Sequence, residues 1–238
     1  ADVPIPALFN MYAAMAKIRI EWNDLPGAEP YALRAIELTE QSESLMFTPY
    51  LVLANLRAAQ GRAQESVRVL EAKIDFFRAG KDLIRSAVAK AGLAQHQIIA
   101  GDLQAAEQWA DNLPAQAYHQ VGYVGEINGL VLMRLLRAQG RYAEALEISD
   151  RLLAAAEAAR RTGRVLENQA FRAVVLWLLG NSEAACAALL RPLQLAEPEN
   201  ILRTFLEEGP AMHSLPEGDW GEIVEIRPTR LQIHPSDP

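Results

Sequence analysis

A glycine that recurs every 39–40 residues is the feature that most constrains the fold of this 238-residue chain. Gly61, Gly101, Gly140 and Gly180 each follow an apolar stretch, and Asn23 stands at the same place one repeat earlier. Glycine and asparagine are the residues that most readily take the left-handed backbone conformation that ends a helix. The spacing therefore predicts five helical hairpins, each bent at one of these positions.

Small residues keep a fixed distance from each bend. Seven positions before it stand Ala16, Ala54, Ala94, Met133 and Ala173, and five positions after it stand Ala28, Ser66, Ala106, Ala145 and Ala185. Small side chains at both places let the two helices of one hairpin approach closely. Because one hairpin cannot bury its apolar face alone, we expect an all-α fold, an α-solenoid in which about five hairpins stack into a right-handed superhelix with a concave groove.

Apolar residues around these anchors recur at three- and four-residue spacing, which is typical of amphipathic helices. We expect first helices over residues 6–22, 45–60, 83–100, 119–139 and 164–179, and second helices over 26–41, 62–79, 102–112, 141–160 and 182–196. A shorter helix over 199–208 is expected to cover the open end. Residues 1–209 then form one superhelical domain, and residues 210–238 form a Pro-rich tail or linker. For residues 223–226 and 231–233 of the tail, short extended pieces and disorder are both open interpretations.

Charge and composition exclude several classes of protein. The net charge is −7 and no helix carries a basic stripe, so we expect no direct binding of nucleic acid. The longest strongly apolar stretch, Ala173–Leu179, is far shorter than the roughly 20 residues that span a membrane. The single Cys186 cannot form an internal disulfide, and the first residues do not resemble a signal peptide, so we expect a cytoplasmic location. Because the chain does not start with Met, we expect it to be part of a longer protein.

The sequence offers little for catalysis. Its histidines lie far apart and have no His or Cys partner at metal-ligand spacing, so we expect surface or capping roles for His96, His119, His213 and His234. The adjacent Glu207 and Glu208 would point about 100° apart on a helix, which makes them a poor acid–base pair. We therefore predict no enzyme, no metal site and no cofactor.

A binding groove is better supported than a reaction centre. Positions six and three before each bend face inward in an array of this kind, which places Asn55, Gln95 and Arg134 in a polar ladder, one per repeat. Arg137 lies one helical turn from Arg134, and the two would clamp an anion. An ordinary solvated helix face is the alternative interpretation of the same pattern.

Two further residues are candidates for the groove. Glu167 stands near the start of the helix expected over residues 164–179, where it would accept hydrogen bonds from ligand hydroxyls. Trp177 offers a flat apolar face for a sugar or a peptide side chain. The alternative for Trp177, within the run Val-Val-Leu-Trp-Leu-Leu, is a place in the core.

Several phrases of the sequence resemble a known family. The small residues around each bend match the tetratricopeptide (TPR) pattern, although 39–40 residues exceed its usual length of about 34. The C-terminal half reads Arg141-Tyr-Ala-Glu-Ala-Leu-Glu147, then residues 152–167, then Leu195-Ala-Glu-Pro-Glu-Asn-Ile-Leu-Arg-Thr-Phe-Leu-Glu-Glu-Gly-Pro-Ala-Met212. These phrases resemble the helical sensor domain of MalT-like regulators, the large ATP-dependent branch of the LuxR family, over residues 45–212.

The resemblance implies a function in transcription. Such regulators carry an N-terminal ATPase and a C-terminal helix-turn-helix, and a small inducer or regulatory protein binds the superhelix and controls self-association and thereby DNA binding. This sequence shows neither a phosphate-binding loop nor a recognition helix, so it resembles the isolated sensor segment. A free-standing adaptor that holds a peptide in the groove is the main alternative, and a catalytic solenoid is the third.

Overall fold

The computed structural model describes residues 5–42, 46–79, 82–114 and 122–215. Within these residues the chain is helical and contains no strand. Both extended pieces considered for the tail lie outside the described residues. None of the described helices combines the length and the apolar composition that crossing a bilayer requires.

In the described part of the chain, consecutive helices pair into five hairpins, as predicted. The pairs are α1 (Ile5–Glu21) with α2 (Leu25–Gln41), α3 (Thr48–Ala59) with α4 (Ala63–Ala79), α5 (Leu83–Ile99) with α6 (Leu103–Asp111), α7 (Tyr123–Ala138) with α8 (Tyr142–Ala158), and α9 (Thr162–Leu178) with α10 (Ser182–Ala196). The short elements η1 (Glu197–Glu199), α11 (Arg203–Leu206) and α12 (Pro210–His213) follow. The all-α solenoid is confirmed. Residues 119–121, expected to begin the fourth hairpin, lie outside the described residues.

Each hairpin bends at the predicted residue. The backbone angle φ is +59° at Asn23 and between +75° and +82° at the four glycines. At Gly61, the amide donates to Ala58 O over 3.0 Å and the next amide, of Arg62, donates to Arg57 O over 2.8 Å, which is the Schellman arrangement at a helix end. A Cβ built on Gly61 would meet no atom within 4 Å. Backbone conformation, and not lack of space, is therefore what favours glycine here.

The small residues beside the bends form the contacts between paired helices. All ten of the positions counted from the bends are at most 1% exposed, including Met133 and Ser66. The prediction of close helix approach at these positions is confirmed.

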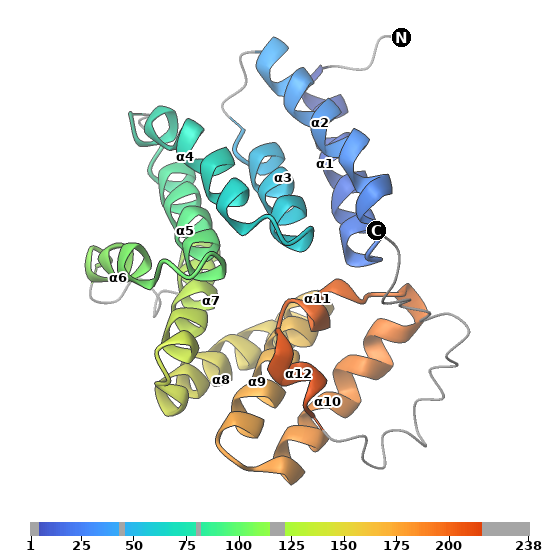
Figure 1. Ribbon diagram of the computed structural model, residues 1–238, viewed down its shortest axis with the longest axis vertical. Helices are drawn as coiled ribbons and strands as arrows, with labels where there is room; N and C mark the ends of the chain where they lie inside the picture. Colours follow the sequence, from blue (N-terminus) through green and yellow to red (C-terminus); the bar gives the residue numbers. More distant parts are fainter. Residues whose placement is uncertain (1–4, 43–45, 80–81, 115–121, 216–238) are drawn as a thin grey trace.

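The hairpins follow one another around an arc, and residues 199–204, which follow α10, return to its first hairpin (Figure 1). Along the arc, α5 packs directly against α7, as α1 packs against α3. The element α11 contacts both α9 and α1. We call residues 197–215 the C-terminal segment.

The single helix predicted over residues 199–208 is wrong. Asn200 takes a left-handed φ of +54°, which interrupts the predicted helix near its start, and Gly209, with φ of +81°, separates α11 from α12. The C-terminal segment therefore folds as three short elements. Its α11 and α12 pack on α9, the first helix of the last hairpin, and do not extend the array.

Candidate functional site: the concave face and its C-terminal segment

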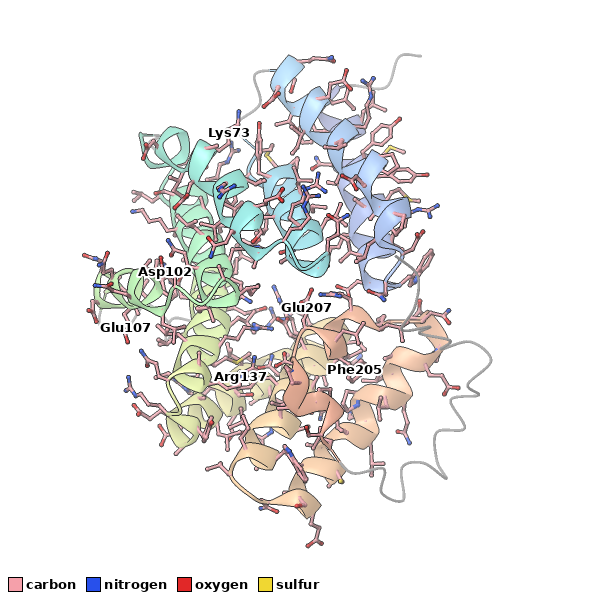
Figure 2. The ribbon with its side chains drawn as sticks, viewed as in Figure 1. Lys73, Asp102, Glu107, Arg137, Phe205 and Glu207 are labelled. Carbon is pink, nitrogen blue, oxygen red and sulfur yellow. The ribbon has the colours of Figure 1, made fainter. Side chains whose placement is uncertain are left out.

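An ionic cluster forms where α7, α9 and the C-terminal segment meet, near Arg137 and Phe205 in Figure 2. Helix α7 contributes Arg134 and Arg137, which lie one turn apart as predicted, and α9 contributes Glu167. The structure therefore brings three of the six predicted site residues into one cluster.

The anion clamp predicted from the two arginines is occupied by a carboxylate of the same chain. Glu208 forms an ion pair with Arg137, and its Oε1 lies 3.8 Å from Arg134 Nη2. Only 2% of the Glu208 side chain is exposed. The guanidinium of Arg137 also lies over the ring of the buried Phe171, 5.0 Å from its centroid. Glu208 thus anchors the C-terminal segment in the concave face.

Glu167 lies on the other side of Arg134. Its Oε1 accepts from Arg134 Nη2 over 2.7 Å, and its Oε2 accepts from Arg164 Nη1 over 2.6 Å. Burial alone would raise the pKa of Glu167, but the two guanidinium groups outweigh it and lower that pKa to about 2. Arg164 extends the cluster to Glu126, with Nε 2.8 Å from Oε1. Glu167 is therefore a fixed anion that orients two arginines.

Asn55 belongs to a buried polar triad. Its Oδ1 lies 3.0 Å from His96 Nε2, and His96 Nδ1 lies 3.0 Å from Ser66 Oγ. His96 is 0% exposed, so the surface or capping role expected for it is wrong. Burial lowers the pKa of His96 to about 4, which keeps the ring neutral near pH 7. The triad joins α3, α4 and α5.

The roles expected for the other three histidines concern parts of the chain that the structure does not describe. His119 and His234, and the side chain of His213, lie outside the described residues.

Gln95 and Trp177 have contrasting surroundings. The Gln95 Oε1 is buried and accepts no hydrogen bond, although the side chain as a whole is half-buried. Trp177 packs partly buried against a cluster that includes Val174, and Phe205 and Met212 of the C-terminal segment pack against the same cluster. The face of Trp177 that was predicted to meet a ligand thus belongs to an apolar region filled by the chain itself.

The C-terminal segment also binds the first hairpin. The Leu202 amide donates to Glu21 O over 2.8 Å, and Thr204 Oγ1 donates to Glu21 Oε2 over 3.1 Å. Trp22 Nε1 donates to Glu199 O over 2.9 Å. The segment therefore connects the first hairpin to the last across the concave side of the array.

Sequence reasoning missed Glu208 and His96 as parts of this site. No local pattern identifies Glu208, because its partners lie 71 and 74 positions earlier on α7. A signal for His96 did exist. It stands five positions before its bend. In three of the other four repeats this position holds Leu56, Leu135 or Val175, each at most 2% exposed, and in the first repeat it holds Ile18, which is 41% exposed.

The arrangement can bind and position an anionic group, and in the described residues no group of three or more His, Cys, Asp or Glu side chains is arranged to hold a metal ion. Comparison with protein families gives one match: the model described as the MalT-like TPR region matches residues 2–216. No curated protein matches the chain at a significant level.

Proposed function

Because the chain belongs to the MalT-like TPR family, we propose that it is the sensing segment of a bacterial transcriptional regulator. In this proposal an effector, either a small molecule or a regulatory protein, binds the superhelix. Binding controls self-association, and self-association controls DNA binding by domains that flank the segment. The segment itself performs no catalysis and does not contact DNA.

The position of Glu208 between Arg134 and Arg137 supports this proposal most directly. An effector that presents a carboxylate or phosphate to these arginines competes with Glu208 for the same donors. Loss of Glu208 from the clamp frees the C-terminal segment, which also contacts Glu21 and Trp22. Occupancy of the concave face is thereby coupled to the contact between the two ends of the array.

Hydrogen exchange tests the coupling in the 238-residue chain. Glu208→Gln removes the buried charge, and removing one partner of a buried ion pair is strongly destabilising. Because Arg134 keeps Glu167, we expect a local loss of about 2 kcal/mol, or roughly 30-fold faster exchange in residues 203–212. Glu197→Gln makes the same charge change at an exposed side chain of the same segment and serves as the control.

The regulatory part of the proposal needs the full-length protein that contains this segment. We expect Glu208→Gln to raise effector-independent self-association, measured by sedimentation velocity, while Glu197→Gln leaves it unchanged. Equal exchange in wild type and Glu208→Gln would show that Glu208 does not hold the segment. Faster exchange with unchanged self-association would show that release of the segment is not the switch.

One observation favours the adaptor as a second candidate function. The concave face already holds a peptide segment, with Phe205 and Met212 against the apolar cluster and Glu208 in the clamp. A partner peptide that pairs an acidic residue with apolar neighbours would compete for this place. An adaptor predicts micromolar affinity for such a peptide and weaker binding after Arg134→Gln. Equal affinity of wild type and Arg134→Gln for this peptide, measured by fluorescence anisotropy, would count against the adaptor.

A further inference from the structure

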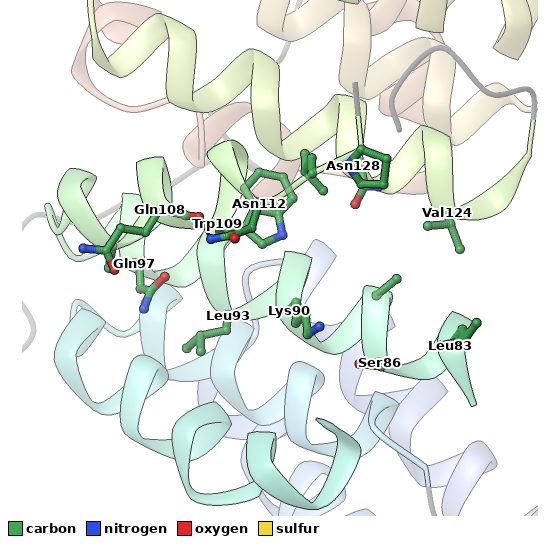
Figure 3. Close-up of a pocket in the computed structure, with 14 residues that line it drawn as sticks. Leu83, Ser86, Lys90, Leu93, Gln97, Gln108, Trp109, Asn112, Val124 and Asn128 are labelled. Atoms are coloured by element: carbon green, nitrogen blue, oxygen red, sulfur yellow. Dashed lines mark hydrogen bonds between the residues drawn. The ribbon is translucent and has the colours of Figure 1, made fainter. Parts of the chain in front are cut away.

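A second hollow lies between α5, α6 and α7, away from the ionic cluster (Figure 3). Its volume is about 700 Å³, within the range of roughly 300–1,000 Å³ that is typical of small-molecule sites. Leu93 and Trp109 lie on its apolar side, and Ser86, Lys90 and Asn128 are among its polar lining residues.

The hollow exists because α6 is short. This helix has 9 residues, whereas the second helices of the other hairpins have 15 or 17. Pro114 follows closely, and the residue before a proline is disfavoured in the helical conformation. In an antiparallel pair the missing half of α6 would cover the first half of α5. Leu83 and Ile84 in that half are accordingly 83% and 59% exposed.

Two polar residues that are mostly buried line this hollow. Asn128 is 3% exposed and Ser86 is 8% exposed, and both line the hollow. Within the described part of the chain, neither side chain makes a hydrogen bond. The Asn128 amide on α7 and the Ser86 hydroxyl on α5 can form hydrogen bonds with a ligand in the hollow.

The charges around the hollow indicate which ligand fits. Among the described residues that line it, Lys90 is the only one with a charge, and none is acidic. In the described residues Lys90 forms no ion pair. The amide nitrogens and the Ser86 hydroxyl can donate to a carboxylate, which in its ionised form only accepts. The indole of Trp109, with Leu93 and Val124, provides an apolar surface for the body of the molecule.

We propose that this hollow binds a small organic carboxylate with a flat or branched apolar body. The carboxylate pairs with Lys90 and receives hydrogen bonds from Asn128 and Ser86, while the apolar body lies against Trp109. The volume of the hollow and the two mostly buried polar residues in its lining favour a small molecule over a protein partner at this place. The inference concerns binding alone and does not depend on the proposed regulatory role.

Matched acid and amide probes test the proposal on the 238-residue chain. Calorimetric titration compares indole-3-acetate with indole-3-acetamide, and benzoate with benzamide. We expect each acid to bind about fivefold more tightly than its amide, the effect of one partly exposed ion pair. Lys90→Gln should remove this difference. Lys17→Gln changes the charge equally at an exposed site on α1 and should leave the difference unchanged.

The buried groups are tested separately. Asn128→Leu should weaken binding of both acids and amides, because it removes a hydrogen-bonding group from the lining of the hollow. If circular dichroism shows that Asn128→Leu does not fold, Ser86→Ala takes its place. Failure of the wild-type chain to bind any of the four probes would overturn the site. Equal binding of acid and amide, unaffected by Lys90→Gln, would overturn the carboxylate class.

Discussion

Between pH 6.5 and about pH 4, acid should destabilise this protein through His96. The ring is 0% exposed, and burial lowers its pKa from 6.5 to about 4. The unfolded chain therefore takes up a proton near pH 6.5, whereas the folded chain resists protonation until about pH 4. The stability that the neutral His96 ring contributes is fully present above pH 6.5 and is lost as the pH falls towards 4.

The size of the effect follows from these two values. A difference of 2.5 pKa units corresponds to about 3 kcal/mol once both states are protonated. Between pH 7 and pH 5 the expected loss is about 2 kcal/mol. Ser66 Oγ donates to Ala63 O over 2.7 Å, so it is free to accept from His96 Nδ1. A neutral ring carries one proton, so it donates either from Nε2 to Asn55 Oδ1 or from Nδ1 to Ser66 Oγ.

The assay is urea denaturation followed by far-UV circular dichroism at several pH values between 7 and 4.5. His96→Gln keeps a polar group in the site but cannot titrate, so carboxylates shared by both chains cancel in the comparison. The stability advantage of wild type over His96→Gln should shrink by about 2 kcal/mol between pH 7 and pH 5. Parallel pH curves for the two chains would refute the reasoning, because they would mean that the ring titrates normally in the folded state.

Further predictions concern the repeat and the ionic cluster. Gly140→Ala should cost about 1 kcal/mol in urea denaturation, since φ is +75° and no atom lies within 4 Å of the added Cβ. Ala145→Leu should cost about 1–3 kcal/mol, because residue 145 is 0% exposed between paired helices; a smaller effect than that of Gly140→Ala would contradict this packing. Glu167 has its pKa lowered from 4.5 to about 2, so its contribution of about 3 kcal/mol is present above pH 4.5 and lost as the pH falls to 2. Glu167→Gln should therefore be less stable than wild type at pH 6 by denaturation, and the gap should close in acid.

The repeat itself could be predicted because its causes are local. Residues such as Gly61 and Asn23 bend the chain through their own backbone preference, and Ala145 permits close helix approach through its size alone. Because these residues recur at nearly constant spacing five times, the sequence alone indicates five hairpins. The prediction that Arg134 and Arg137 lie on one helix face also depended on local sequence alone, since residues three apart on a helix are neighbours.

What fills the concave face was decided by the tertiary structure. Glu208 reaches Arg137 across 71 residues, and His96 meets Asn55 across 41, distances over which helical periodicity carries no information. The sequence by itself determined where the chain bends and which small residues meet, because these depend on single residues and their neighbours. Only the packed array decided that the predicted anion clamp holds a carboxylate of its own chain, because that pairing depends on how the C-terminal segment packs against α7 of the fourth hairpin.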